Sequence, residues 1–319
     1  MPSPPTRKEG CVVANVVVTG GAGFIGSHVV KRLLDGGHQV WVLDNLSTGK
    51  KERLSGEAHL IQLDLTVADL HPVFERIRPE VVIHLAAQTD VNRSVADPTQ
   101  DAHVNILATI KLIQTGVCYG LKHFIFASSA AVYGEVQAVP VLETAPLKPI
   151  SPYGLSKRTA EAYIELLTKQ HDVVYTIFRL ANVYGPGQEA SPESGVITLF
   201  FEKIRAGSSP VVYGDGNQTR DFIYVRDVAE GFYQGVIQPR QGVFHLSTGE
   251  ETSINQLLHI LGKLSGRTVQ PVYQRERPGD IRRSALANAK MKEAFNWQPK
   301  YSLQDGLQEM LEIRYNQTR

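Results

Sequence analysis

The sequence is poor in cysteine, with only Cys11 and Cys118 among its 319 residues. Two cysteines cannot build the disulfide framework of a small secreted protein, so a reducing, intracellular compartment is the default expectation. No apolar run approaches the roughly 18 residues that a membrane-spanning helix needs, which argues against a membrane protein. The polar, proline-rich start also lacks the apolar segment of a signal peptide. We therefore expect a cytoplasmic protein in which residues 1–13 form a flexible extension.

The sequence also lacks a charge imbalance, because 33 lysines and arginines face 32 aspartates and glutamates, for a net charge of +1. The basic residues are scattered rather than clustered, so we expect no nucleic-acid partner. His84, His103 and His123 are not connected by HxxxH or HxH spacing. We interpret them as packing or surface residues and expect no metal site.

What the chain does have is a regular alternation of two kinds of segment over its first 180 residues. Short apolar runs rich in β-branched residues predict buried strands at Asn15–Thr19, Gln39–Leu43, His59–Leu63, Val81–His84, His123–Ala127 and Val173–Arg179. Helix-like stretches lie between them, among them Phe24–Asp35, Asp97–Tyr119 and Pro152–Gln170. This alternation predicts a parallel, doubly wound sheet with right-handed crossovers.

Beyond residue 180 the alternation gives way to loops rich in glycine and proline, which indicates a smaller lobe that contacts a ligand. Val243–Leu246 has the composition of a late strand that returns to the main sheet. We therefore predict one domain over residues 14–180 and a second lobe over residues 181–319, with some segments of the second in the sheet of the first.

A glycine-rich turn joins the first predicted strand to the first predicted helix. The glycines fall at Gly20, Gly23 and Gly26, in a GxxGxxG pattern. Glycines at such a turn allow tight turning, close approach to a pyrophosphate and close helix packing, with the phosphates at the helix N-terminus. An ordinary glycine-rich turn is the alternative. The context favours a dinucleotide site, because Asp44 ends the second strand.

Asp44 indicates which dinucleotide the loop binds. A carboxylate at this place accepts hydrogen bonds from a ribose 2′-hydroxyl and repels a 2′-phosphate, which favours NAD over NADP. The alternative is that Asp44 only caps the turn formed by residues 45–49. Asp64 and Leu65 end the third strand and are candidates for the adenine edge.

Tyr153 and Lys157 stand four residues apart at the predicted start of a long helix, so they share one helix face. An ammonium beside a phenol stabilises the phenolate, which can then act as a base well below its usual pKa of about 10. Because a dinucleotide loop lies upstream, the pair predicts removal of a proton from an alcohol while a hydride leaves its carbon.

Taken together, ordered motifs from about residue 15 to residue 313 resemble the extended short-chain dehydrogenase/reductase family, and within it the NAD-dependent UDP-glucose/UDP-galactose 4-epimerases. The resemblance implies a Rossmann-type α/β fold with a smaller C-terminal α/β substrate-binding lobe. The matching stretches are residues 18–26, 44–49, 84–87, 128–134, 153–157, 179–186, 220–227 and 277–280.

The resemblance implies a catalytic set in which Ser129 hydrogen-bonds the reacting sugar oxygen, Tyr153 exchanges its proton, and Lys157 holds the nicotinamide ribose and keeps Tyr153 partly ionised. Ser129 is favoured over Ser128, although serines at strand ends are common. The residues implied to bind NAD are Gly20, Gly23, Phe24, Ile25, Gly26, Asp44, Asn45, Asp64, Leu65, Leu85, Ala86, Ala87, Asn105, Tyr153 and Lys157. The residues implied to bind a UDP-sugar are Ser129, Asn182, Val211, Tyr213, Arg220, Arg277, Asp280 and Ser284.

Ala130 and Ala131 narrow the reaction. Related enzymes that eliminate water or carbon dioxide place acidic side chains at these positions, and two alanines can neither protonate a leaving hydroxyl nor deprotonate C5. We therefore predict reversible epimerisation at C4 through a 4-keto intermediate. Net oxidation with an exchangeable cofactor and a non-catalytic sensor of dinucleotides are the alternatives.

Ser284 bears on the choice of sugar. It aligns with a position that is a tyrosine in epimerases restricted to glucose and galactose, so the smaller serine predicts that 2-acetamido sugars are also accepted. UDP-glucuronate is a further possibility, which the two glutamates of residues 187–195 disfavour. The resemblance also implies a homodimer, because the helices of the family that correspond to Asp97–Tyr119 and Pro152–Gln170 form a subunit interface. A helix buried in the core of one subunit has the same apolar pattern.

Overall fold

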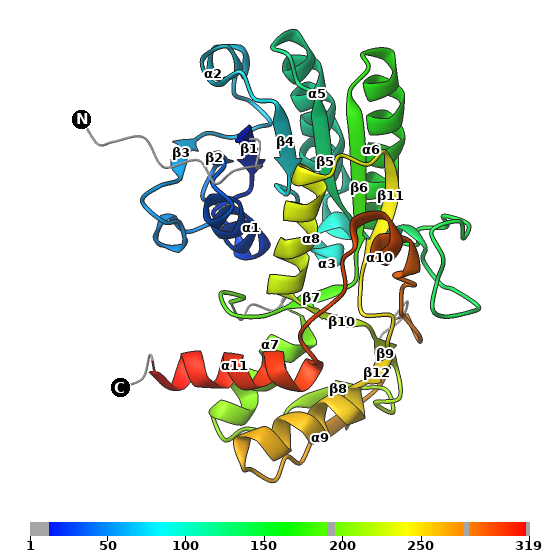
Figure 1. Ribbon diagram of the computed structural model, residues 1–319. Helices are drawn as coiled ribbons and strands as arrows, with labels where there is room; N and C mark the ends of the chain where they lie inside the picture. The colour runs from blue at the N-terminus through cyan, green and yellow to red at the C-terminus, as the bar shows by residue number, and fades with distance from the viewer. Residues whose placement is uncertain (1–12, 190–194, 277–280, 317–319) are drawn as a thin grey trace.

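The computed structural model describes residues 13–189, 195–276 and 281–316 (Figure 1). Its centre is a seven-stranded sheet in the order β11-β6-β5-β4-β1-β2-β3, and every strand pair in it is parallel. The strands are β1 (Asn15–Thr19), β2 (Gln39–Asp44), β3 (His59–Gln62), β4 (Val81–His84), β5 (His123–Ser129), β6 (Val174–Leu180) and β11 (Gly242–Leu246). All six strands predicted before residue 180 are confirmed, with ends that differ by at most two residues, and the late strand does return to the sheet.

Helices cover both faces of this sheet, as a doubly wound fold requires. On one face α1 (Phe24–Asp35), α8 (Val225–Ile237) and α10 (Ala289–Phe295) bury the side chains of alternate strand residues such as Val16, Val18 and Phe178. On the other face α2 (His71–Ile77), α5 (Ala108–Cys118) and α6 (Pro152–Gln170) bury the intervening residues, such as Val17 and Ile177. The predicted Rossmann-type α/β fold is confirmed.

The predicted helix Asp97–Tyr119 is a helical run that is not uniform. It consists of α4 (Pro98–Ala102), one π-helical turn η2 (His103–Leu107) and α5. Asp97 caps its start by accepting the Gln100 N–H at 2.9 Å. A π turn holds one extra residue, which apolar periodicity does not reveal, and such turns are frequent at functional sites. Asn105 lies in this turn.

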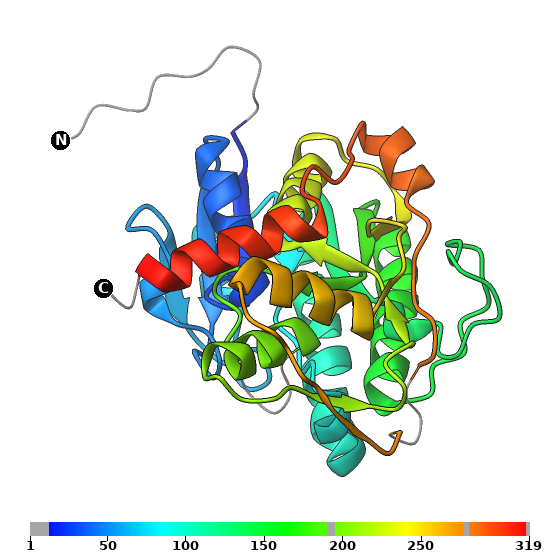
Figure 2. The same ribbon diagram turned by 90° about the horizontal axis from the view of Figure 1, so that it is seen from below.

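The second lobe packs around its own apolar cluster, which includes Phe200, Leu257 and Met310. In Figure 2, α9 (gold) and α11 (red) lie side by side, and α7 (green) packs against α9. The lobe contains α7 (Val196–Arg205), β8 (Val211–Tyr213), α9 (Ile254–Ser265), β13 (Val272–Gln274) and α11 (Leu303–Asn316). Short pairs connect it to the main sheet domain: β7 (Asn182–Tyr184) with β10 (Phe222–Tyr224), and β9 (Thr219–Arg220) with β12 (Thr252–Ser253). The remaining elements are η1 (Lys51–Arg53), α3 (Val91–Ala96) and η3 (Ala130–Val132).

The chain crosses between the two parts more than once. Residues 225–246 form α8 and β11 of the main sheet domain, although they lie within the predicted second lobe. The division at residue 180 therefore stays a proposal about function rather than a clean structural boundary.

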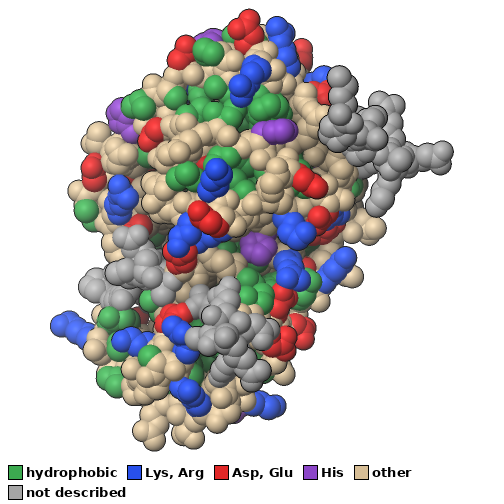
Figure 3. Space-filling model, turned by 90° about the vertical axis from the view of Figure 1, so that its left-hand side faces the viewer, with side chains coloured by type: hydrophobic (Ala, Val, Ile, Leu, Met, Phe, Trp, Pro, Cys, Tyr) green, Lys and Arg blue, Asp and Glu red, His purple; other side chains and the backbone are tan. Residues whose placement is uncertain are grey.

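The surface shows no single field of charge on the face drawn in Figure 3, where basic and acidic side chains are interspersed. Among the described residues no helix combines the length and apolarity needed to cross a membrane. The described side chains also contain no group of three or more histidines, cysteines, aspartates or glutamates that could hold a metal ion.

Candidate active site

The glycine loop, where we predict that a dinucleotide pyrophosphate binds, packs so closely against the backbone around it that side chains would clash. Gly20 has φ +68°, and a Cβ there would lie 2.7 Å from the Ala86 nitrogen; a Cβ on Gly26 would lie 2.1 Å from the Gly20 carbonyl oxygen. Gly23 is the N-cap of α1 and offers no side chain to its first N–H groups, which Phe24, Ile25 and Gly26 carry. A helix N-terminus without a side-chain cap or an acidic first turn is ready to receive phosphate.

Asp44, which is predicted to bind a ribose, also accepts hydrogen bonds from the loops around it. Its buried carboxylate accepts the Ala22 N–H at 3.0 Å and the Leu46 N–H at 2.8 Å. The alternative role as a turn cap is therefore real. It is compatible with ribose binding, because each carboxylate oxygen can accept more than one hydrogen bond.

Asn45, Asp64 and Leu65 lie beside Asp44 at the carboxyl ends of β2 and β3. Asn45 Nδ2 donates to Asp64 Oδ2 at 3.0 Å. Hydrogen bonds from Thr66 and Asn45 hold the pKa of Asp64 below its usual value. The predicted adenosine end of the site is thus gathered in one place, and its contacts with NAD stay predictions.

A chain of hydrogen bonds fixes the end of β4, where Leu85, Ala86 and Ala87 follow. Thr109 Oγ1 donates to the Asn105 carbonyl at 2.8 Å, so it must accept from His84 Nε2 at 3.0 Å. His84 Nδ1 then accepts from Thr19 Oγ1 at 2.7 Å, and Thr19 Oγ1 accepts the Ala86 N–H at 3.2 Å. Burial lowers the pKa of His84 to about 3, so the ring is neutral. His84 is the packing residue that we expected, and it ties the glycine loop to the π turn.

Asn105 holds the same loop from the π turn. Its Oδ1 accepts the Gln88 N–H at 2.9 Å, and its Nδ2 lies 3.0 Å from the Gln88 carbonyl, 3.1 Å from Asp101 Oδ1 and 3.1 Å from Ser156 Oγ. These contacts bind the loop after β4 to the first turns of α6. Contact between Asn105 and the cofactor stays a prediction, and its side chain already has a full set of protein partners.

Ser129, Tyr153 and Lys157 come together where β5 ends and α6 begins. The Ser129 side chain lies close enough to the Tyr153 phenol to lower its pKa, and its Oγ accepts the Ala131 N–H at 3.1 Å. Lys157 Nζ is buried and donates to the Ala127 carbonyl at 2.9 Å. The structure thus brings together the three residues predicted to be catalytic.

The start of α6 is fixed by its cap. Ser151 Oγ accepts the Gly154 N–H at 3.1 Å, and Pro152 occupies the first position, where a missing N–H costs nothing. The Tyr153 N–H donates to the buried Ser94 Oγ at 3.1 Å. Tyr153 therefore lies in the first turn, with its backbone held from both sides.

Burial decides the charges of this pair. Burial raises the pKa of Tyr153, the hydrogen bond with Ser129 lowers it, and the negative charge of Asp101 raises it. Burial lowers the pKa of Lys157 to about 8, against the charges of Asp101 and Glu161, which raise it. Burial and Asp101 thus raise the pKa of Tyr153, Ser129 lowers it, and the role of Lys157 in ionising Tyr153 stays a prediction.

Two buried carboxylates near this pair, Asp101 and Glu161, are not among the residues predicted from the sequence. Glu161 follows Lys157 by four residues on α6 and pairs with the buried Arg179 at 2.6 Å. The spacing of four residues along the helix was the available signal. Arg179 begins one of the stretches that resemble the family, residues 179–186, but the resemblance implies no catalytic or binding role for it.

Residues predicted to bind the substrate line the junction with the second lobe. Asn182 begins β7, and Val211 and Tyr213 begin and end β8. Arg220 Nη1 donates to the Ile281 carbonyl at 2.7 Å and to the Thr219 carbonyl at 2.8 Å. The predictions for Arg277 and Asp280 lie outside the described residues.

The segment that carries Ser284 is held on both sides, and Ser284 itself is half-buried. Before it, the Arg282 carbonyl accepts the Thr219 N–H at 3.0 Å. After it, the Ala285 carbonyl accepts the Val141 N–H at 2.8 Å, and the Leu286 N–H donates to the buried Asp221 at 3.2 Å. Its position is thus set by contacts with two separate segments, residues 219–221 and Val141.

Glu189 is one of the two glutamates whose negative charge disfavours an acidic sugar in the sequence-based prediction. In the structure its carboxylate pairs with two basic side chains of the protein. It pairs with Lys50 at 2.5 Å and with Arg53 at 2.8 Å. These partners lie beside the glycine loop, on the cofactor side. The charge argument against UDP-glucuronate therefore loses much of its weight.

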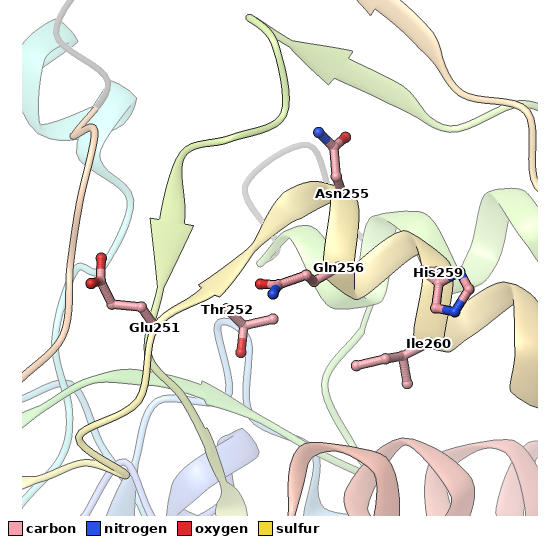
Figure 4. A pocket seen from close by; sticks show the side chains of 6 residues that line it. All are labelled: Glu251, Thr252, Asn255, Gln256, His259 and Ile260. Carbon is pink, nitrogen blue, oxygen red and sulfur yellow. The ribbon is translucent and has the colours of Figure 1, made fainter.

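An open hollow with a volume of ≈ 470 Å³ lies in the second lobe (Figure 4). Its lining residues are Glu251, Thr252, Asn255, Gln256, His259 and Ile260. The side chains of two of them make local contacts. Asn255 donates to the Asp215 carbonyl, and Gln256 accepts from the N–H of Ser253, the N-cap of α9. None of the six is a predicted site residue.

Comparison with known proteins agrees with this arrangement. The model of the NAD dependent epimerase/dehydratase family matches residues 16–245. The chain belongs to this family. It is therefore an NAD-dependent enzyme.

Individual relatives share nearly the whole chain. A UDP-glucose 4-epimerase of Mycolicibacterium smegmatis is 37% identical over 95% of this chain and 99% of its own. The structure of a UDP-glucose 4-epimerase from Thermotoga maritima with UDP-glucose is 40% identical, with a TM-score of 0.93 over 95% of this chain and 99% of that one. A UDP-N-acetylglucosamine 4-epimerase from Methanobrevibacter ruminantium, in complex with UDP-N-acetylmuramic acid, is 36% identical, with a TM-score of 0.91 over 96% and 99%.

Proposed function

We propose that the protein catalyses the reversible C4 epimerisation of a UDP-hexose, UDP-glucose to UDP-galactose, through a transient 4-keto sugar with bound NAD. The observation that carries this proposal is the Ser129–Tyr153 pair beside a buried Lys157, followed by two alanines. The similarity to two UDP-sugar 4-epimerases over nearly the whole chain supports it.

In the proposed reaction Tyr153 takes the proton from the C4 hydroxyl, and Ser129 holds the same oxygen. NAD held at the glycine loop would supply the acceptor for the C4 hydride and the source from which C4 regains it on its opposite face, and the positive charge of a nicotinamide ring would favour the Tyr153 phenolate that burial alone disfavours. Tyr153 then returns the proton to the new hydroxyl. Ala130 and Ala131 leave the ketone without a group for elimination or decarboxylation.

The Gly20, Gly23 and Gly26 loop would hold the pyrophosphate of NAD, and Asp44 its adenosine ribose. Because no net oxidation occurs, the cofactor need not leave between turnovers. The proposal therefore includes cofactor that remains with the purified protein. An enzyme that oxidises the sugar would need a cofactor that exchanges freely. A dinucleotide sensor would convert no sugar at all.

Ser284 supports a broader substrate range within this reaction. A small side chain at this place leaves volume for a 2-acetamido group, so we propose that UDP-N-acetylglucosamine and UDP-N-acetylgalactosamine are also interconverted. The resemblance to a UDP-N-acetylglucosamine 4-epimerase agrees with this. UDP-glucuronate remains the second candidate, since Glu189 is neutralised by Lys50 and Arg53.

The substitution Ser284→Tyr tests the substrate range. We expect it to abolish turnover of the acetylated sugars and to spare UDP-glucose, because the tyrosine ring fills the acetamido volume. Initial rates with UDP-galactose, UDP-N-acetylgalactosamine and UDP-glucuronate check this, with Ser284→Ala as the matched control that keeps the volume open. Equal survival of both sugar classes in Ser284→Tyr would show that residue 284 is no gate.

We also propose that the protein is a homodimer. α3 and α6 expose apolar side chains: Val91 is 45% exposed, Val95 63%, Leu155 53% and Leu166 56%. A second copy packed on this face would cover them, in line with the family resemblance. Light scattering on the purified protein at micromolar concentration measures this directly.

A further inference from the structure

Two side chains of the central sheet converge on one carboxylate behind the candidate active site. Ser128 and Arg179 are direct partners across β5 and β6, and both face α6. Glu161 on α6 accepts from Ser128 Oγ at 2.5 Å, from Arg179 Nε at 2.9 Å and from Arg179 Nη2 at 2.6 Å. The Arg179 and Glu161 side chains are each only 4% exposed.

Stability alone does not explain this ion pair. Desolvating two charges costs about as much as their attraction returns, and replacing a buried pair by apolar side chains is often neutral or stabilising. A bidentate arginine–carboxylate pair does fix geometry, because its two parallel hydrogen bonds set both distance and orientation. The relevant question is therefore which parts of the active site this geometry fixes.

Glu161 links the two elements that carry the predicted catalytic residues. Tyr153, Lys157 and Glu161 follow one another at intervals of four along α6, on one helix face. Ser128, which Glu161 holds, is followed directly by Ser129, the partner of the Tyr153 side chain. The Glu161–Ser128 bond thus sets the distance between α6 and the end of β5.

The same network extends to the substrate side. Arg179 Nη1 donates to the Tyr133 hydroxyl at 2.6 Å, and the buried His245 Nδ1 donates to the Ala287 carbonyl at 2.8 Å. His245 Nε2 therefore accepts from the Tyr133 hydroxyl at 2.6 Å. Because Ala287 follows Ser284 by three residues, the network joins the catalytic strand to the segment that carries the predicted gate.

We propose that Glu161, together with Ser128 and Arg179, is a positioning residue that sets Ser129 against Tyr153 and connects this geometry to the Ser284 segment. The proposal rests on the proposed epimerase reaction. It assigns Glu161 no contact with substrate or cofactor.

The substitution Ser128→Ala tests this proposal, because it cuts the bond to Glu161 and leaves the ion pair in place. We expect kcat for UDP-galactose to fall about tenfold, with KM and the content of bound NAD unchanged, since a small displacement of Ser129 acts on the transition state. Glu161→Gln should lower kcat further. Glu165→Gln, one turn beyond Glu161 on α6 and exposed, is the matched control: Glu165 interacts with Glu161 and Arg179 only through its charge, and the variant should keep the parent kcat.

Amide hydrogen exchange of residues 128–132 adds a readout that needs no substrate. Ser128→Ala should speed exchange there and leave the glycine loop unchanged. The proposal is overturned by Ser128→Ala with parental kcat and parental exchange. It is also overturned if kcat, thermal stability and bound NAD fall together in all variants, including Glu165→Gln, because the effect would then be general destabilisation. If the parent protein converts no UDP-sugar, the proposed function fails, and the exchange result alone decides the positioning role.

Discussion

At the scale of single residues, the candidate chemistry depends on a phenol in an unfavourable place for ionisation. Tyr153 is held at its backbone by Ser94 and at its side chain by Ser129, while burial raises its pKa. Lys157 is charged below a pKa of about 8 and donates a hydrogen bond to the Ala127 carbonyl. The positive charge that would favour ionisation of Tyr153 is the one that we propose for the nicotinamide ring of bound NAD.

The substitution Tyr153→Phe removes the group that carries the proton and leaves the shape of the site. We expect the rate of epimerisation to fall by about 10³-fold, within the range of a lost general base, with bound NAD retained because the glycine loop is untouched. Steady-state rates and the NAD released on denaturation measure both effects. Residual activity within a few-fold of the parent would mean that another group moves the proton.

The spacing of Tyr153 and Lys157 was enough to predict that they share a helix face, because helical geometry is local. Asp101 and Glu161 could not be predicted as members of the same site in this way. Asp101 lies in α4 just before the π turn and accepts from Asn105 of that turn at 3.1 Å, and apolar periodicity does not show the π turn. Glu161 is fixed by Ser128 and Arg179 on two distant strands. Such contacts exist only once the sheet has formed.

At the scale of elements, the segment that leads into the second lobe lies against the cofactor helix. His28 on α1 hydrogen-bonds the Pro186 carbonyl at 2.9 Å. Arg53 Nη2 donates to the Gly187 carbonyl at 3.0 Å and to Glu189 at 2.8 Å, and its Nη1 lies 3.4 Å from the Ala22 carbonyl. Arg53 thus connects the glycine loop to the loop over residues 186–189.

The substitution Arg53→Ala should weaken the retention of NAD. Loss of charge-assisted hydrogen bonds at a largely buried guanidinium raises the dissociation constant by about tenfold, at roughly 1.5 kcal/mol. The content of NAD after gel filtration measures this. Lys50→Ala is the control, because Lys50 touches Glu189 from an exposed position. Equal NAD content in all three proteins would contradict a role of this loop in holding the cofactor.

At the scale of the whole molecule, three buried histidines make the free energy of unfolding depend on pH in the acidic range. Burial lowers the pKa of His84 to about 3 and the pKa values of His123 and His245 to about 4. In the unfolded chain each imidazole binds a proton below about pH 6.5, which the folded chain does not. Their contribution is therefore complete above pH 6.5 and is lost as the pH falls toward 4.

We expect the free energy of unfolding to fall by about 4 kcal/mol between pH 7 and pH 5.5, at about 1.4 kcal/mol for each histidine. Urea denaturation at the two pH values measures the difference. His123→Gln keeps a donor for Thr176, which His123 bonds at 2.8 Å, and removes one titration, so it should reduce the difference by about a third. A free energy that is equal at both pH values would contradict neutral burial of these rings.

The two-part architecture was predictable because alternating strands and helices dictate a doubly wound sheet, and the change in pattern after residue 180 marks the second lobe. The return of residues 225–246 to the main sheet domain was visible only in part, through Val243–Leu246. α8 packs against α1, which lies about 200 residues earlier in the chain. Periodicity shows that a helix is amphipathic and does not show which partner it meets.

The central claim is that a 4-keto sugar forms and is reduced again by the same bound cofactor. The most direct measurement is incubation of the purified protein with UDP-galactose in D₂O, without added cofactor, followed by proton NMR of the sugar. The account predicts an equilibrium mixture of UDP-galactose and UDP-glucose that carries no deuterium at C4 or C5, because the hydride never exchanges with solvent. Deuterium in the ring, or no conversion even after NAD is added, would contradict it.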